Sequence, residues 1–154
     1  MSNAKSEPII SFRDFQPADI DSCLALFDLN SPAFFAPNER QDYFQFLEWV
    51  KHGYFLGMLD QAIVATYGLY FTADKTRAQL AWIIVSPHLQ GSGIGSEMMH
   101  RVLSKARAEC AKVLEIKASH LSAPFFAKFG AVGDPLIPDG WGKGMHRIDM
   151  NLPL

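Results

Sequence analysis

Three glycines within five residues mark the stretch of this sequence whose chemistry is clearest. They lie in Gln90-Gly91-Ser92-Gly93-Ile94-Gly95, directly before residues that repeat with a helical period. Glycine lets the backbone approach a ligand closely, and the N-terminus of the following helix adds a favourable dipole. The arrangement predicts a site for an anion, most simply a phosphate group. An ordinary glycine-rich turn that caps a helix is the alternative.

The residues on either side predict the elements that hold this loop. Leu80 to Val85 is an almost continuous apolar run rich in β-branched and aromatic residues, which predicts a buried strand, and Pro87 ends it. After the loop, residues four positions apart form the apolar stripe of a helix: Ile94, Met98, Val102, Ala106 and Cys110. Strand, glycine loop and helix in this order direct the N–H groups of the loop toward a common point.

The spacing of the glycines narrows the class of ligand. A dinucleotide fingerprint has the form G-x-G-x-x-G with an acidic residue about 20 positions later, whereas the glycines here follow G-x-G-x-G and that later position is Ala111. A P-loop requires a lysine, which Gly95-Ser96 lacks. The pattern that fits is Q/R-x-x-G-x-G/A, behind the strand end Val85-Ser86-Pro87. It resembles the acetyl-CoA pyrophosphate loop of the GNAT superfamily of N-acetyltransferases.

Length and composition predict one ordinary globular domain. The chain has 154 residues, 49% of them hydrophobic and 19% charged, and a net charge of −2 without a basic block. These values argue against nucleic acid and membrane as partners and favour a cytoplasmic protein. Cys23 and Cys110 form no spaced pair, so we expect two reduced cysteines packed on helices and no metal site. We assign residues 1–4 to an expression-vector remnant and residues 5–154 to the domain.

The pattern along the rest of the chain predicts a mixed α/β sheet. The full order is β-α-α-β-β-β-α-β-α-β-β, in three layers with helices on both faces of the sheet. This order resembles the GNAT topology over nearly the whole chain. Besides the central strand and helix, the expected elements are strands over residues 9–15, 54–60, 62–71, 113–117 and 145–152, helices over 17–29, 38–51 and 122–129, and a loop over 133–144.

A second stretch strengthens this resemblance. Residues 119–131 resemble the late family signature N-x-x-A-x-x-F-Y-x-K-x-G-F, in which Phe125, Lys128 and Gly130 match. Ser119 and Ser122 depart from it. The resemblance implies acetyl-CoA as cofactor, held by these residues: Ile83, Ile84, Val85, Gln90, Gly91, Ser92, Gly93, Ile94, Gly95, Ser96, Ser119, Ser122 and Phe126.

The acid and base that the family commonly uses are both absent. Family members often carry a glutamate on the central strand, where this chain has Gln79 and Ala81, and Phe126 replaces the tyrosine that protonates the leaving sulfur. A lysine side chain lies roughly 3.4 pKa units above pH 7, which costs about 4–5 kcal/mol to deprotonate, whereas an α-amino group needs only about one unit. The remaining catalytic candidates are His120 as a base, and Ser119 and Gln79 as ligands of a water.

The acceptor side follows from the topology that the resemblance implies. The loop between the first two helices and the loop before the last strand flank the acceptor groove, which assigns Phe34, Phe35, Glu39 and Trp141 to an acceptor pocket. Phe34 and Phe35 could equally pack down as a flap of the core. We therefore expect direct acetyl transfer to a primary amine of a small molecule or peptide. A non-catalytic acyl-CoA-binding sensor is the alternative, and a homodimer through an edge strand stays open.

Overall fold

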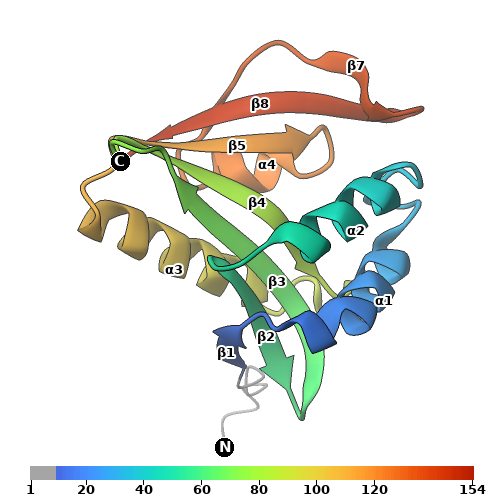
Figure 1. Ribbon diagram of the computed structural model, residues 1–154. Helices are drawn as coiled ribbons and strands as arrows, with labels where there is room; N and C mark the ends of the chain where they lie inside the picture. The colour runs from blue at the N-terminus through green and yellow to red at the C-terminus, as the bar shows by residue number, and fades with distance from the viewer. Residues whose placement is uncertain (1–9) are drawn as a thin grey trace, which may run out of the picture.

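One mixed sheet organises the molecule. The computed structural model describes residues 10–154 (Figure 1). The sheet has the order β1-β2-β3-β4-β5-β8-β6, with β7 paired to β8. The strands are β1 (Ser11–Asp14), β2 (Tyr54–Leu59), β3 (Ala62–Phe71), β4 (Arg77–Val85), β5 (Val113–Ser119), β6 (Val132–Gly133), β7 (Ile137–Gly142) and β8 (Met145–Pro153). Among residues 10–154 only β4 and β5 pair in parallel, so the expected mixed sheet is confirmed.

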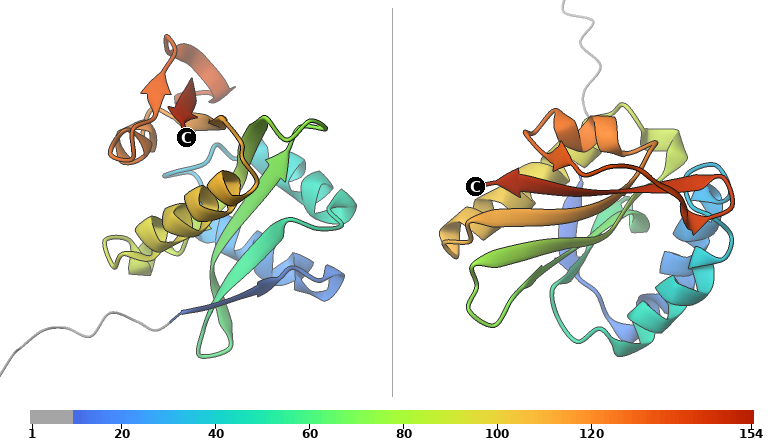
Figure 2. Two further views of the ribbon diagram at one scale, coloured as in Figure 1. Left: turned by 90° about the vertical axis from the view of Figure 1, so that its left-hand side faces the viewer. Right: turned by 90° about the horizontal axis from the view of Figure 1, so that it is seen from above.

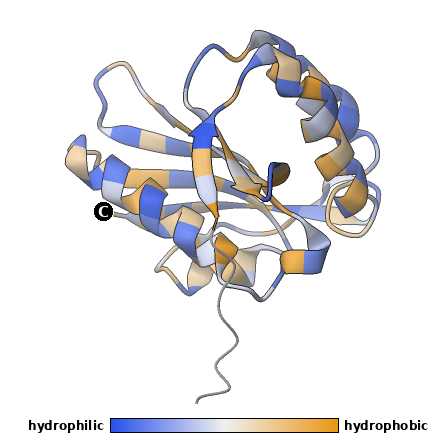
Figure 3. Cartoon of the chain, turned by 90° about the horizontal axis from the view of Figure 1, so that it is seen from below, coloured by the Kyte–Doolittle hydropathy of each residue, from blue (hydrophilic) through white to orange (hydrophobic). Residues whose placement is uncertain are grey.

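Helices cover both faces of the sheet, as Figure 2 shows. On one side, α1 (Ile20–Asn30) and α2 (Glu39–Trp49) bury an aromatic core against β2 and β4. On the other, α3 (Ile94–Ala108) and α4 (Ala123–Ala127) pack on a second core, whose fully buried side chains are mostly aliphatic. Hydrophilic and hydrophobic residues alternate around the turns of α3 (Figure 3), and the hydrophobic ones are buried. The three-layer arrangement is therefore the one that the sequence pattern predicts.

Three local expectations were wrong. Residues 133–144 were expected as loop but contain β7, which pairs only with β8 and whose residues are mostly exposed, so no apolar alternation marks it. The first helix begins at Ile20, after a single 3-10 turn over Pro17–Asp19. Cys110 is exposed beyond the end of α3, in a left-handed conformation with φ 63°, and does not join the buried stripe.

Some expectations concern residues that the structure does not test. Ile9 and the remnant assigned to residues 1–4 lie outside the described residues. Within residues 10–154, no helix is long and apolar enough to cross a membrane. β1 and β6 stand at the two ends of the strand order, so a homodimer through one of these edges stays a prediction.

Candidate active site

The central feature is a gap between two neighbouring parallel strands. β4 and β5 pair only from Arg77 opposite Val113 to Leu80 opposite Ile116. Beyond that point β4 stays on β3 and β5 stays on β8, so the two strands spread apart toward their C-terminal ends (Figure 1). One edge of β4 after Leu80 therefore has no partner strand. Unpaired backbone groups in such a place can pair with a ligand.

A bulge in β4 accompanies this divergence. The register of β3 and β4 shifts between Thr66 and Gly68, and Trp82 in the bulge has φ 45°, which is rare for a large side chain. The carbonyl oxygen of Trp82 leaves the ladder and accepts hydrogen bonds from the hydroxyls of Thr66 (3.0 Å) and Tyr54 (3.1 Å). The surrounding core thus holds a strained backbone at the centre of the sheet, as is typical of functional sites.

The gap opens into a cleft of about 770 Å³. It extends from the turn before α3, past β4 and β5, to the segment between α1 and α2. The residues that line it are Asn30, Phe34, Phe35, Glu39, Leu80, Ala81, Trp82, Ile83, Ile84, Val85, Leu89, Gln90, Gly91, Gly93, Gly95, Ser96, Ile116, Lys117, Ser119, Leu121, Ser122, Phe125, Phe126, Lys128 and Trp141. Most of the residues assigned to a site from sequence are among them.

The glycine turn forms one end of this cleft, which we call the cofactor half after the role predicted for it from the sequence. Gly91 (φ 80°) and Gly93 (φ 90°) both adopt left-handed conformations that favour glycine, and Gly93 is the N-cap of α3. The first N–H groups of α3 have no partner within the helix, so this turn presents donors and a positive dipole end. Ser92 and Ile94 do not line the cleft: the Ser92 hydroxyl donates to the carbonyl of Leu89, and Ile94 is 3% exposed in the core.

The start of α4 forms the wall opposite β4. The hydroxyls of Ser119 and Ser122 lie 3.2 Å apart, and Ser119 Oγ also accepts the N–H of Ser122. Phe125 packs against Gly95 of α3, where a Cβ atom would lie 3.2 Å from the end of the ring. Phe126 lines the cleft but is only 2% exposed. The wall thus offers two hydroxyls near the middle of the cleft and no proton from position 126.

Two catalytic candidates from the sequence do not line the cleft. The Gln79 amide donates to Glu115 (3.0 Å) on the part of β4 that is still paired with β5. His120 directly follows β5, its Nδ1 accepts the backbone N–H of His146 (3.2 Å), and the two imidazole rings lie 4.7 Å apart. The structure therefore gives neither side chain a contact with the cleft. Sequence position alone suggested them, because both lie within a few residues of segments that do reach it.

The other end of the cleft is built from side chains, and we call it the acceptor half after the role predicted for it from the sequence. Phe35 packs on Trp82, with ring centroids 6.2 Å apart, whereas Phe34 is 38% exposed at the rim. The Trp141 indole N–H donates to the carbonyl of Ala118 (2.9 Å), and the Asn38 side chain donates to the carbonyl of Trp141 (2.7 Å). Both rings line the cleft and Phe35 also packs against the core, so their assignment to an acceptor pocket stays a prediction.

Glu39 supplies the carboxyl group of this half. It is the first residue of α2 and only 4% exposed, and its Oε2 accepts the N–H of Ala36 (2.7 Å). Burial raises the pKa of Glu39 to about 7, against the Ala36 hydrogen bond, which lowers it, and nearby Asp42 raises it further. A carboxyl group with such a pKa can both accept and release a proton near neutral pH.

The sequence did not indicate every lining residue. Trp82 was read only as part of a buried strand, and Asn30 and Lys117 carried no signal. Asn30 is 2% exposed and donates to the carbonyl of Leu26 (2.9 Å), which is the behaviour of a structural residue. A bulge in the middle of an apolar run leaves no mark in a hydrophobic pattern, so Trp82 could be found only in three dimensions.

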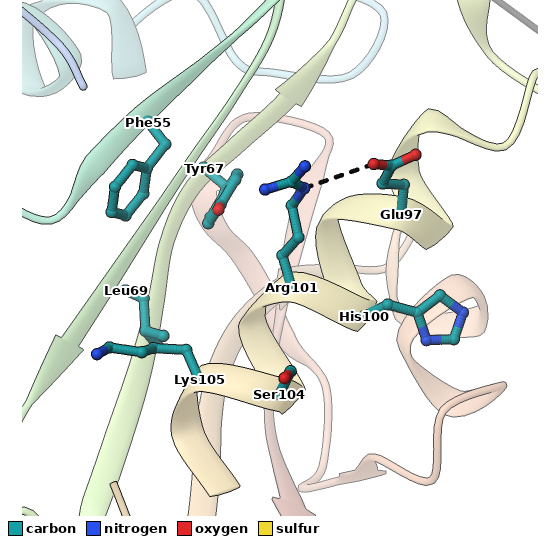
Figure 4. Close-up of a pocket in the computed structure, with 8 residues that line it drawn as sticks. All are labelled: Phe55, Tyr67, Leu69, Glu97, His100, Arg101, Ser104 and Lys105. Carbon is teal, nitrogen blue, oxygen red and sulfur yellow. Dashed lines mark ion pairs between the residues drawn. The ribbon is translucent and has the colours of Figure 1, made fainter. Parts of the chain in front are cut away.

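A second cavity of about 620 Å³ lies between the sheet and α3 (Figure 4). The strands contribute Phe55, Tyr67 and Leu69, and α3 contributes Glu97, His100, Arg101, Ser104 and Lys105. The Arg101 guanidinium pairs with Glu97 (3.5 Å) and lies 4.2 Å above the ring of Phe12. Lys105 pairs with Glu109 (2.9 Å) outside the cavity, and the glycine turn contributes nothing to the lining.

Known proteins share this architecture. Solved structures similar over most of both chains include Ard1 from Thermoplasma volcanium (TM-score 0.74, 18% identity, 94% of this chain and 97% of that one). The ribosomal-protein-S18-alanine N-acetyltransferase from Escherichia coli gives a TM-score of 0.73 at 15% identity and 94% of each chain. An aminoglycoside 6′-N-acetyltransferase complexed with coenzyme A gives 0.69 at 14%, covering 94% and 96%. At such identities the likeness shows the fold.

The sequence itself carries the family assignment. Among curated proteins, none matches this chain. The model of the acetyltransferase (GNAT) family, however, matches residues 23–131, which include the glycine turn, the diverging strands and α4. With this match over more than half of its length, the chain belongs to the GNAT family of N-acetyltransferases.

Proposed function

We propose that this protein binds acetyl-CoA in the cofactor half of the cleft and transfers the acetyl group directly to a primary amine in the acceptor half. The single observation that carries the proposal is the continuity of the cleft. It joins an anion-binding turn, Gly91 to Gly93, to a buried carboxyl group, Glu39, along an unpaired strand edge. The acceptor half has the features that an amine requires, a carboxyl group and aromatic walls.

The residues of the cofactor half fit coenzyme A. A pyrophosphate can be held by the N–H groups of the glycine turn and the start of α3, helped by the side chains of Gln90 and Ser96. The edge of β4 from Ile83 to Val85 has backbone groups that no strand satisfies, and a pantetheine arm carries amide groups of the matching kind. When bound, acetyl-CoA supplies an electrophilic thioester carbonyl.

Direct transfer is supported by the position of the cysteines. Burial raises the pKa of the Cys23 thiol to about 11, so the nucleophilic thiolate is scarce near neutral pH. Cys110 is exposed beyond the end of α3, and neither cysteine lines the cleft. An acetyl-cysteine intermediate therefore has no residue to form on. The hydroxyls of Ser119 and Ser122 can hold a water that returns a proton to the leaving sulfur.

The names of two similar structures fit an amine acceptor. One acts on the alanine of a ribosomal protein and another on an aminoglycoside, by the names that they carry. Their acceptors differ from each other, which agrees with a family in which the cofactor half is shared and the acceptor half varies. For this chain we commit to the class, a primary amine, and to no particular compound.

Calorimetric titration with acetyl-CoA tests the cofactor half first. We expect the wild type to bind in the micromolar range and Gly93→Trp to lose binding by at least about 100-fold, because the indole would occupy the turn. Gly144→Trp is the matched control: Gly144 also has a left-handed φ of 78°, with open space around it, and does not line the cleft. Equal binding by the wild type and Gly93→Trp would contradict the proposed site.

Thiol release from acetyl-CoA then tests transfer. The assay uses primary amines, namely 2-phenylethylamine, free lysine and a peptide with an unblocked N-terminus. Release that depends on one of these amines supports acetyl transfer. Binding of acetyl-CoA without amine-dependent release would instead favour the acyl-CoA-binding sensor.

A further inference from the structure

The acceptor half contains a buried acid that binding of the cofactor does not require. Glu39 is 4% exposed and lines the cleft, and one of its two oxygens accepts the N–H of Ala36. Its Oε1 has no donor among residues 10–154, and it is not one of their fully enclosed unpaired atoms. This oxygen therefore keeps some exposed surface, on a residue that lines the cleft. A carboxylate oxygen with exposed surface in a ligand site is suited to bind an ammonium group.

The charges around Glu39 leave it without a partner from the protein. Within the described residues it forms no ion pair, since the adjacent Arg40 is held by Asp28 at 2.8 Å. Asp42, on the same helix, is the nearest acidic neighbour that acts on it. Lys117 from β5 and Lys128 after α4 are the basic residues that line the same cleft. A positive charge brought by a ligand would thus satisfy a carboxylate that the fold leaves unpaired.

We propose that Glu39 binds the acceptor ammonium and acts as the general base that removes its proton. This inference rests on the proposed function, because it assigns a role within the same transfer. It also narrows the acceptor to a primary amine that carries an apolar or aromatic group, since Phe34, Phe35, Trp82 and Trp141 form the walls beside the carboxyl group.

The proton transfers balance without a further reactant. The Glu39 carboxylate takes one proton from R–NH₃⁺, and the neutral amine nitrogen uses its lone pair to form a bond to the thioester carbonyl carbon. The C–S bond breaks and its electron pair leaves on sulfur. The nitrogen loses a second proton, which passes to the thiolate through the water held by Ser119 and Ser122. The products are the amide and coenzyme A thiol, and Glu39 releases its proton to solvent.

Other residues of the cleft cannot replace Glu39 in this role. The side chains of Gln79 and His120 do not line the cleft, and Phe126 has no proton to exchange. The hydroxyls of Ser119 and Ser122 are too weakly basic to hold a proton from an ammonium group. The Glu39 pKa of about 7 lies between an ordinary carboxyl group and an amine, which lets the side chain accept a proton and then release it near neutral pH.

Glu39→Gln tests the inference with little change in shape, because the amide oxygen can still accept the N–H of Ala36. Glu48→Gln is the matched control, an exposed glutamate on the same helix. Both variants are first checked for thermal unfolding and for acetyl-CoA affinity by calorimetry. Thiol release is then measured from pH 6 to 9.5 with 2-phenylethylamine, and with the amine on which the wild type is most active.

The expected result separates binding from chemistry. Glu39→Gln keeps acetyl-CoA affinity within twofold but lowers kcat by about 100-fold. The wild-type kcat/KM, which reports the free enzyme, rises as pH increases through about 7, the pKa of Glu39, whereas that of the variant rises only toward the pKa of the amine, about 10. Glu48→Gln behaves as the wild type in affinity, rate and pH profile.

Two other results would overturn the inference, and a third would overturn the function on which it rests. If Glu39→Gln has the wild-type kcat and pH profile, Glu39 is not the general base. If the substitution changes only KM, Glu39 binds the amine but does not remove its proton. If wild-type protein binds acetyl-CoA but releases no thiol with any amine tested, the proposed transfer itself fails. The unchanged wild type thus distinguishes the two failures.

Discussion

The two halves of the cleft are built from different parts of the polypeptide. The cofactor half consists mainly of backbone: a glycine turn, the first turn of α3 and the free edge of β4. The acceptor half consists of side chains from four separate segments, represented by Phe34, Glu39, Trp82 and Trp141. The first is a contiguous run of sequence, and the second exists only after α1, α2, β4 and β7 have come together.

Under the proposed function, this difference explains how one fold can keep a cofactor and change an acceptor. Backbone donors depend on conformation, so substitutions that preserve the turn preserve the site. A wall of side chains can change with each substitution while the sheet is retained. We therefore expect changes in the two halves to separate cleanly in experiments: the cofactor half through acetyl-CoA affinity, and the acceptor half through the kinetics of the amine.

Trp82 offers the most severe challenge to this separation, because it belongs to both halves. Its backbone forms the bulge in β4, and its indole packs against Tyr43 at 4.8 Å and against Phe27, Phe35 and Phe46. We expect Trp82→Ala to lower the free energy of unfolding by about 4 kcal/mol, through lost contacts and a cavity. Urea unfolding measures this loss.

Trp49 is the matched control for that substitution. It is 78% exposed at the end of α2, so Trp49→Ala should change the free energy of unfolding by less than about 0.5 kcal/mol. If the folded fraction of Trp82→Ala still binds acetyl-CoA with near wild-type affinity, the bulge in β4 forms without the Trp82 indole. The cofactor half then does not depend on the side chains of the acceptor half. Loss of acetyl-CoA binding in folded protein would show that it does.

Features formed by consecutive residues could be predicted from the sequence, whereas features formed by distant segments could not. The glycine turn was found because its conformation is written in consecutive residues, and the central strand and α3 follow from clear periodicity. β7 was missed because Ile137-Pro138-Asp139-Gly140 has the composition of a turn, and one-sided pairing with β8 demands no apolar pattern. The carboxyl group of Glu39 was assigned to the acceptor pocket from topology, but its burial and raised pKa arise only from packing.

Glu39 also makes the stability of the protein depend on pH. Its pKa rises from the usual 4.5 to about 7 on folding, so between these values the folded state binds more protons than the unfolded state. Stability therefore falls as pH rises through this window, and a cost on the order of 3 kcal/mol is fully present above about pH 7. Urea unfolding of the wild type and Glu39→Gln at pH 5, 6, 7 and 8 measures it.

The variant isolates this contribution from all other titrating groups. The difference in unfolding free energy between Glu39→Gln and the wild type should grow in favour of the variant as pH rises from 5 to 7 and then level off. A difference that stays constant across this range would mean that Glu39 ionises as easily in the folded protein as in the unfolded chain. The acceptor half would then lack a buried carboxyl group with a raised pKa.

The smallest effect is expected at Asn38, which connects two walls of the acceptor half. The Asn38 side chain donates to the carbonyl of Trp141 and ties the segment before α2 to β7, and it makes no capping hydrogen bond to its own helix. Asn38→Ala should weaken amine binding by about 1 kcal/mol, because the hydrogen bond that aligns these walls is lost. The KM of the amine should rise by a factor of about five, and acetyl-CoA affinity should stay unchanged. Exposed Gln45 on α2 provides the control, Gln45→Ala. The hydrogen bond joins two residues of the acceptor half. If Asn38→Ala also lowered acetyl-CoA affinity, the structure of the cofactor half would depend on this contact.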